Sequence, residues 1–149
     1  MQYLLDTNVV SAYFRAHTDD PLVAMIATHA GEVAISVTVW HELRFGWALL
    51  PPSRKKLALG SFLDSVVTPN FPILDYDRRA AEWHAKERAS LRERGIAAPY
   101  ADGQVAAVAY VHERIVVTDN VKDFRMYQGL SVERWPHLVQ APSGDSAGG

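Results

Sequence analysis

The chain has 149 residues, a length typical of one domain, and its 48% hydrophobic and 21% charged residues are ordinary for a globular protein. It contains no cysteine, which excludes disulfides, a thiol nucleophile and a zinc–thiolate site. A net charge of −2 excludes attachment to nucleic acid by bulk positive charge alone. No apolar run approaches the roughly 20 residues of a membrane span, and no secretory signal pattern is found. We expect a soluble, cytoplasmic protein.

Short apolar runs alternate with longer helical stretches along the chain. In chain order, the pattern predicts a strand at 3–5, helices at 9–15 and 21–30, a strand at 33–36, helices at 38–50 and 53–67, a strand at 71–74, helices at 77–94 and 102–112, and strands at 115–118 and 130–133. We expect one domain over residues 1–140. The segment 141–149 is of low complexity and is expected to be disordered.

Short apolar strands separated by helices indicate a mostly parallel sheet that is covered on both faces, which is the α/β class. In such sheets the ligand site lies beyond the carboxyl ends of the strands. Acidic residues that follow strands are therefore the first candidates for a functional site.

Four acidic residues occupy such positions. Asp6 closes the first predicted strand, Glu42 lies six residues beyond the second, Asp102 opens the helix 102–112, and Asp119 follows the strand 115–118. A structural alternative is open for Asp6 and Asp102, because an aspartate at a helix start commonly accepts backbone N–H bonds. Glu42 lies on a mostly apolar helical face, where a carboxylate needs a partner.

If these carboxylates converge, they favour a bound cation. Two like charges ~5 Å apart repel by roughly 3 kcal/mol at an effective dielectric constant near 20, so the cluster would take up protons or bind a metal ion. Oxygen ligands without cysteine favour Mg²⁺ or Mn²⁺ over zinc. These ions assist phosphoryl chemistry, and the cluster therefore predicts metal-assisted phosphodiester hydrolysis.

Four motifs in register resemble the PIN-domain ribonucleases, in particular the VapC toxins of VapBC toxin–antitoxin pairs, including the FitB-like branch. The first three motifs are Leu4-Leu5-Asp6-Thr7-Asn8-Val9-Val10-Ser11, Ile35-Ser36-Val37-Thr38 with Glu42-Leu43 and Gly46, and Asp102-Gly103-Gln104-Val105-Ala106-Ala107. The fourth is a carboxyl-terminal block of Val117-Thr118-Asp119-Asn120, Asp123-Phe124 and Gly129-Leu130-Ser131-Val132-Glu133-Arg134-Trp135. The likeness covers about residues 2 to 135.

The resemblance implies a three-layer α/β/α sandwich and an Mg²⁺- or Mn²⁺-dependent endoribonuclease that often cuts transfer or ribosomal RNA. It implies that Asp6, Glu42 and Asp102 hold the metal. Asp119 joins the implied catalytic set, although some relatives carry their last acid where this chain has Asn120. Neighbouring side chains of an extended chain point in opposite directions, so either Asp119 or Asn120 faces the site. Residues implied to orient the carboxylates are Thr7, Asn8, Thr118 and Asn120.

The resemblance also implies a homodimer and a cognate VapB-like antitoxin that blocks the site, with DNA bound only through the antitoxin. Trp40, Phe45, Trp47, Leu49 and Leu50 are candidates for the antitoxin groove, with core packing as the favoured interpretation. Two other functions are open: a non-catalytic PIN-like binding module, and an aspartate-based phosphatase or phosphotransfer domain. The phosphatase or phosphotransfer alternative fits poorly, because haloacid-dehalogenase-like enzymes of this kind have a second aspartate where this chain has Asn8.

Overall fold

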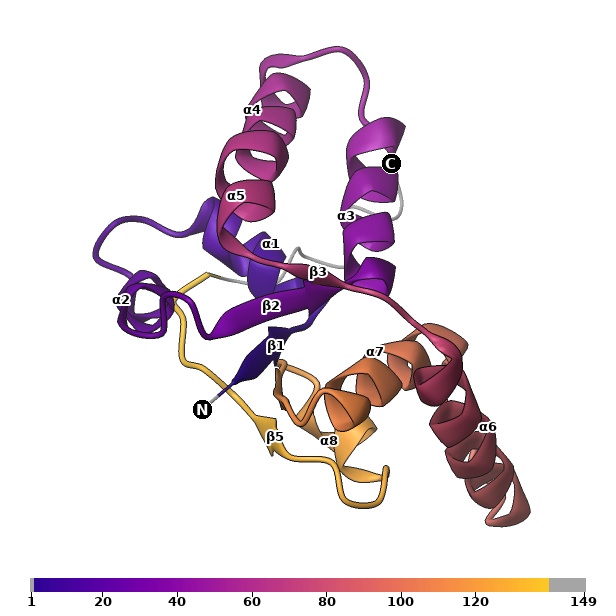
Figure 1. Cartoon of the computed structure of the whole chain (residues 1–149). Coiled ribbons are helices and arrows are strands. Elements are labelled where there is room, and N and C mark those ends of the chain that lie inside the picture. Colours follow the sequence, from indigo (N-terminus) through magenta and orange to yellow (C-terminus); the bar gives the residue numbers. More distant parts are fainter. Residues whose placement is uncertain (1, 140–149) are drawn as a thin grey trace.

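A five-stranded sheet, parallel throughout, forms the centre of the protein in the computed structural model, which describes residues 2–139 (Figure 1). The strand order is β3-β2-β1-β4-β5. The strands are β1 (Tyr3–Leu5), β2 (Val33–Ser36), β3 (Ile73–Leu74), β4 (Ile115–Val117) and β5 (Val132–Glu133). Strand β1 is central and wholly buried, and its Tyr3 pairs with Val33 on one side and Ile115 on the other.

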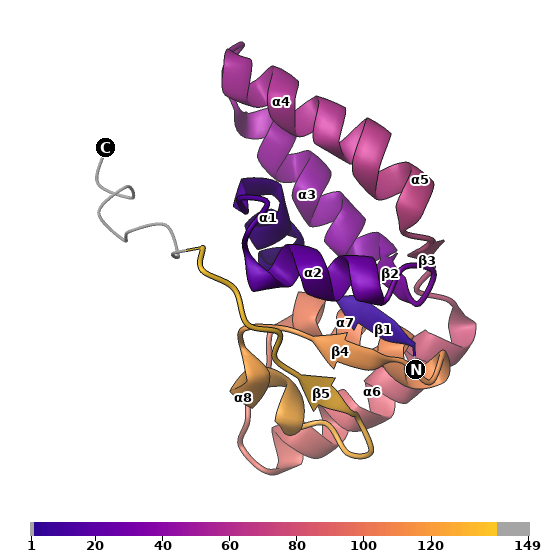
Figure 2. The same cartoon turned by 90° about the vertical axis from the view of Figure 1, so that its left-hand side faces the viewer.

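Helices cover both faces of this sheet. The chain runs from β1 outward to β3 and then returns to place β4 on the other side of β1, so the early helices lie on one face and the late helices on the other (Figure 2). The early group is α1 (Thr7–Arg15), α2 (Pro21–Thr28), α3 (Val37–Leu49), α4 (Arg54–Phe62) and α5 (Thr68–Asn70). The late group is α6 (Arg78–Glu93), α7 (Tyr100–Val111) and α8 (Val121–Arg125). The expected three-layer α/β/α sandwich is confirmed.

Side-chain caps begin several helices where the sequence predicts a start. Ser53 accepts a hydrogen bond from the backbone N–H of Lys56, and Asp77 accepts one from Ala80. Asp20 caps α2, with Pro21 at its first position, where the missing N–H costs nothing. Gly95 follows α6 with φ +76°, a conformation that favours glycine.

Several elements differ from the prediction: α1 begins two residues earlier, at Thr7, and the strands expected at 71–74 and 130–133 are shortened to Ile73–Leu74 and Val132–Glu133. The helix expected at 53–67 is α4 followed by a π-helical turn, Leu63–Val67, and the short α5. Helix α7 begins at Tyr100 rather than Asp102, and α8 was not predicted. A helix of five residues spans little more than one turn, which is too short for a hydrophobic period to be visible in the sequence.

The core forms around β1, β2 and β4, but one face of α3 does not join it. Phe45 and Leu49 are 56% and 68% exposed, so the prediction that they pack in the core is wrong. Trp40 and Trp47 are partly buried against the core. Within residues 2–139, no helix is both long and apolar enough to cross a membrane. The predicted tail 141–149 lies outside the described residues.

Candidate active site

The predicted acidic residues come from elements that meet at the carboxyl edge of the sheet. Asp6 directly follows β1, Asp119 follows β4, Glu42 lies on α3 immediately beyond β2, and Asp102 lies in the first turn of α7. The charges of Asp6 and Glu42 both raise the pKa of Asp102. The charges of Glu42 and Asp119 both raise the pKa of Asp6. The structure therefore gathers these carboxylates into one electrostatic cluster.

Asp6 is the most buried member, with 7% of its surface exposed. Its Oδ1 accepts the backbone N–H of Thr7 at 2.9 Å, and its Oδ2 accepts the hydroxyl of Thr118 at 2.8 Å. Burial raises the pKa of the Asp6 carboxyl, and the two hydrogen bonds oppose that rise. Asp6 therefore caps α1, as the structural alternative predicted, but its second oxygen accepts a hydrogen bond from Thr118, beyond the neighbouring strand β4.

Glu42 is half-buried on α3 and has a partner on α1. The hydroxyl of Thr7 donates to Oε2 of Glu42. Thr7 therefore joins two carboxylates, through its backbone N–H to Asp6 and through its side chain to Glu42. Nearby, the Thr38 hydroxyl donates to Gln104 at 3.1 Å, which ties α3 to α7.

Among residues 2–139, Asp102 is the carboxyl whose pKa is raised furthest from its ordinary value. Burial, followed by the charges of Asp6, Asp123 and Glu42, raises its pKa to about 6. The capping alternative is wrong for Asp102, because α7 begins at Tyr100 with Pro99 before it and no side-chain cap. A carboxyl poised to titrate near neutral pH is typical of functional sites.

Asp123 is an acidic neighbour that sequence reasoning missed. It lies on α8, an element that was not predicted, and its charge raises the pKa of both Asp102 and Tyr127. The available signal was its position in the Asp123-Phe124 pair within the carboxyl-terminal block.

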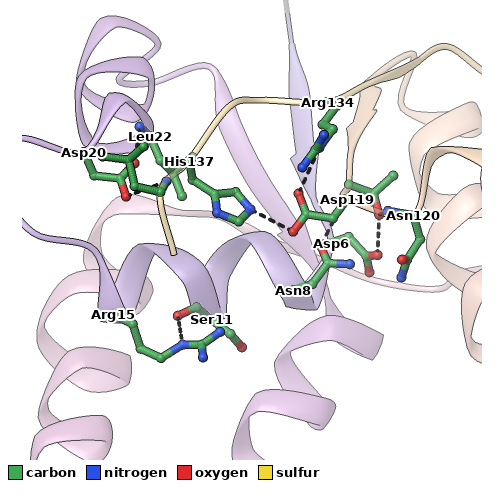
Figure 3. A network of polar contacts seen from close by, with 12 residues as sticks. Asp6, Asn8, Ser11, Arg15, Asp20, Leu22, Asp119, Asn120, Arg134 and His137 are labelled. Carbon is green, nitrogen blue, oxygen red and sulfur yellow. Dashed lines mark hydrogen bonds and ion pairs between the residues drawn. The ribbon is translucent and has the colours of Figure 1, made fainter. Parts of the chain in front are cut away.

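The Asp119 side chain faces the segment after β5, as Figure 3 shows. Its Oδ2 lies 2.8 Å from Nε2 of His137, and its Oδ1 lies 3.7 Å from Nε of Arg134. Its backbone N–H donates to Oδ1 of Asn8 at 3.3 Å. Asn120 is exposed, and its backbone N–H donates to the Thr118 hydroxyl at 3.0 Å.

The cluster is rich in oxygen donors, but within residues 2–139 no three histidine, aspartate or glutamate side chains stand close enough together to form a ready metal site. The donor chemistry nevertheless fits a hard divalent cation. Burial, followed by repulsion from neighbouring carboxylates, raises the pKa of Asp6 and of Asp102, so both gain from a cation that neutralises them.

Helix α7 is fixed against α6 by an unusually close contact. His84 is 3% exposed, and its Nδ1 lies 2.8 Å from the hydroxyl of Tyr76. A Cβ atom added to Gly103 would stand 2.1 Å from Nε2 of His84. The absence of a side chain at Gly103 therefore lets α6 approach the turn that carries Asp102.

Comparison with known proteins identifies the fold family. The PIN domain profile matches residues 3–129. The chain belongs to the PIN-domain family. Toxin FitB of Neisseria gonorrhoeae is 35% identical over 124 residues, which span 81% of this chain and 89% of FitB. VapC ribonuclease Y4jK of Sinorhizobium fredii is 31% identical over 124 residues, which span 81% of this chain and 89% of Y4jK.

Solved structures agree with this assignment. The structure of FitAB bound to an IR36 DNA fragment superimposes with a TM-score of 0.81 at 30% identity, and the match covers 95% of this PIN-domain protein and 100% of that chain. The residues that suggested the family in the sequence therefore sit on the expected fold.

Proposed function

We propose that this PIN-domain protein is the toxin of a type II toxin–antitoxin pair and that it hydrolyses RNA phosphodiester bonds with the aid of Mg²⁺ or Mn²⁺. The observation that carries the proposal is the cluster of Asp6, Glu42 and Asp102 at the carboxyl edge of the sheet, where burial and mutual repulsion raise the pKa of Asp102 to about 6. FitB and Y4jK, which bear the names of a toxin and a ribonuclease, support the same assignment. An RNA substrate such as transfer or ribosomal RNA implies action in the cytoplasm.

Asp6, Glu42 and Asp102 would hold the cation in this mechanism. When bound, the cation supplies positive charge to the scissile phosphate and lowers the pKa of water for in-line attack, which leaves a 5′-phosphate and a 3′-hydroxyl. We include Asp119 in the proposed catalytic set because its negative charge adds to the rise in the pKa of Asp6.

The chain's own hydrogen bonds fix the directions of these carboxylates. Thr118 and the backbone N–H of Thr7 hold the two oxygens of Asp6, and the Thr7 hydroxyl holds Glu42. Such contacts orient metal ligands and limit their rotation. Two hydrogen bonds stabilise the loop after β4. The backbone N–H of Asp119 donates to Asn8, and the backbone N–H of Asn120 donates to the Thr118 hydroxyl.

We also propose a homodimer that binds a cognate VapB-like antitoxin, with DNA contacted only through the antitoxin. A relative of similar fold has been solved as FitAB bound to an IR36 DNA fragment, which supports this proposal. The exposed side chains of Phe45 and Leu49 on α3 supply apolar surface that suits a protein partner. A non-catalytic binding module is the second candidate, because Asp6 does cap α1. PIN-domain membership leaves the phosphotransfer alternative without support.

Cleavage of total cellular RNA by antitoxin-free protein tests the proposal. We expect discrete fragments in Mg²⁺ or Mn²⁺, none in EDTA, and none from an Asp102→Asn variant. Asp75→Asn is the matched control, since Asp75 is exposed and lies outside the cluster. It should cleave as the parent does.

Thermal unfolding separates the two candidates without any RNA. Metal at a hundred times its dissociation constant should stabilise the parent by about 2.7 kcal/mol and should not stabilise Asp102→Asn. A folded parent that neither cuts RNA nor gains stability from either metal would favour the binding module.

A further inference from the structure

A pocket of about 330 Å³ lies between the end of α6 and the segment that leads to α7. It is lined by Arg88, Leu91 and Arg92 of α6 and by residues 95–98. Helices α6 and α7 lie side by side (Figure 1), and the first turn of α7 carries Asp102. The pocket is therefore separated by only a few residues of chain from a proposed metal ligand.

Both charged side chains of this pocket are positive and exposed. Among the described residues, no aspartate or glutamate lines the pocket, and neither Arg88 nor Arg92 forms an ion pair with a carboxylate. Glu87, which precedes Arg88 in the sequence, accepts the backbone N–H of Gln128 at 2.6 Å. The pocket thus carries two positive charges that its own lining does not balance.

Helix stability does not explain this pair of arginines. Residues four apart on a helix share a face, where like charges repel each other. At the same spacing on α6, Arg78 instead faces a carboxylate, with its Nε 3.0 Å from Oε1 of Glu82. The dipole of α6 favours a positive charge in its last turn, which accounts for Arg92, but Arg88 lies one turn earlier. The position of Arg88 therefore indicates an anion from outside the chain.

Tyr100 holds Arg88 in place without neutralising it. Cζ of Arg88 lies 5.1 Å from the centroid of the Tyr100 ring, within the range of a cation–π interaction. The Tyr100 ring packs in turn against the buried His84, with ring centroids 5.0 Å apart. Such a contact limits the movement of the guanidinium and leaves its N–H donors available to an acceptor.

The same ring joins the pocket to the carboxylate cluster. Tyr100 is the first residue of α7, two residues before Asp102, and it is 50% exposed. Each nucleotide of an RNA strand carries a phosphate, so a strand with one phosphate at Asp102 has others close by. Arg88 and Arg92 lie where such neighbouring phosphates need positive charge.

The apolar part of the pocket favours a nucleotide over a simple anion. Leu91, Ile96, Ala97 and Ala98 provide apolar surface beside the two arginines. A single RNA strand alternates charged phosphates with sugars and bases that offer apolar faces, and arginine guanidinium groups also stack on bases. Phosphate alone would use the charge of the pocket but not its apolar floor.

We propose that Arg88 and Arg92 bind backbone phosphates of a single-stranded RNA segment that extends from the carboxylate cluster. Tyr100 is a positioning residue for Arg88, and the apolar floor of the pocket lies under the adjoining sugar or base. The inference rests on the proposed ribonuclease function, because it takes the RNA substrate as the occupant. It assigns substrate affinity to α6, a helix that contributes none of the proposed metal ligands.

RNA binding as a function of salt tests the two arginines. Affinity for a single-stranded oligouridylate is measured with Asp102→Asn protein, and then with that protein carrying Arg88→Gln and Arg92→Gln. We expect affinity to fall on the order of tenfold, and the slope of log K against log salt to shrink by about 1.4, the value for two phosphate contacts on a single strand. Arg78→Gln with Lys86→Gln is the matched control, because it removes the same charge from the same helix outside the pocket. It should leave both quantities close to those of the Asp102→Asn protein.

Variants of Tyr100 test the positioning of Arg88. Tyr100→Phe keeps the ring and should leave RNA affinity unchanged. Tyr100→Leu removes the ring and should weaken binding severalfold, whereas the same change in an Arg88→Gln background should have little effect. An equal loss with and without Arg88 would show that Tyr100 acts only through the fold and would overturn its positioning role. A lower Tm with the parental salt slope would overturn it as well.

The kinetics of the cleaving parent separate this proposal from the ribonuclease assignment. Arg88→Gln with Arg92→Gln should raise KM and leave kcat nearly unchanged. If the double variant cuts RNA with the parental KM and binds it with the parental salt slope, the RNA surface fails and the ribonuclease function stands. If the parent cuts no RNA yet binds it through the two arginines, the surface stands and the ribonuclease function fails. If the double variant binds RNA as the parent does but no longer binds poly-glutamate, the pocket takes an acidic protein segment and the proposal is overturned.

Discussion

A single methyl group at Gly103 tests how the helix that carries Asp102 is held. The Gly103→Ala methyl would stand 2.1 Å from Nε2 of His84 and 2.7 Å from its Cδ2, well inside the contact distance of real atoms. The imidazole cannot move aside freely, because it is 3% exposed and its Nδ1 is bonded to Tyr76 at 2.8 Å. The clash must therefore displace His84 or separate α6 from α7.

The expected cost follows from three contributions. Overpacking in a filled core costs about 1–3 kcal/mol. Losing the bond between Tyr76 and His84 costs about 1 kcal/mol more. Alanine has a higher helix propensity than glycine, which offsets about 1 kcal/mol of this loss of stability. We expect Gly103→Ala to lower the free energy of unfolding by about 1–3 kcal/mol, which corresponds to a fall in Tm of roughly 3–10 °C for a domain of this size.

Gly46→Ala provides the matched control. Gly46 lies on α3, and a Cβ there meets nothing within 4 Å. The same substitution should therefore raise the free energy of unfolding by about 0.5–1 kcal/mol. Urea unfolding of both variants measures the contrast. In a His84→Ala background, the added methyl at Gly103 should cost far less, which a double-mutant cycle would register as coupling.

If Gly103→Ala were as stable as Gly46→Ala, the reasoning would be refuted. Equal costs of Gly103→Ala with and without His84 would show that the close contact does not decide the packing of α7.

Two further predictions follow from buried polar contacts. Thr118→Val removes the 2.8 Å hydrogen bond to the buried Asp6 and should lower the free energy of unfolding by about 1.5–3 kcal/mol. Thr28→Val, on an exposed helix surface, is the control and should change that free energy by no more than about 0.5 kcal/mol. Equal effects of the two variants in urea unfolding would contradict the role of Thr118. Burial, and then the charge of Arg88, lowers the pKa of His84 below its ordinary 6.5 in the folded protein. The unfolded chain therefore takes up the proton more readily, and the stability contributed by neutral His84 is complete above pH 6.5 and declines as the pH falls below it. His84→Gln should flatten the pH dependence of unfolding between pH 6.5 and 5, and slopes identical to those of the parent would exclude this contribution.

The sequence by itself determined the fold class and indicated Asp6, Glu42, Asp102 and Asp119 as acids of one site, without Asp123. Apolar runs mark the strands, and in a parallel sheet their carboxyl ends share one edge, so acids that follow neighbouring strands lie close together. Asp6 and Asp119 follow this rule directly. Glu42 follows it through the helix that begins at the end of β2. The motifs around these residues also predicted the family that comparison then established.

Boundaries set by short or unusual turns could not be predicted. The α8 helix spans five residues, and the π-helical turn at Leu63–Val67 interrupts a stretch whose composition indicates one continuous helix. Asp123 was missed for the same reason, since its place near Asp102 depends on α8.

Only the tertiary structure decided which way each side chain faces and what it touches. Three contacts join segments that are far apart in sequence. Asp119 contacts His137 and Arg134, the Thr7 hydroxyl donates to Glu42, and His84 packs against Gly103. Periodicity reports whether a residue faces a core, but not which distant atom it meets there. Those contacts depend on how the helices pack across the sheet, so the direction of each carboxylate and the raised pKa of Asp102 exist only in the folded chain.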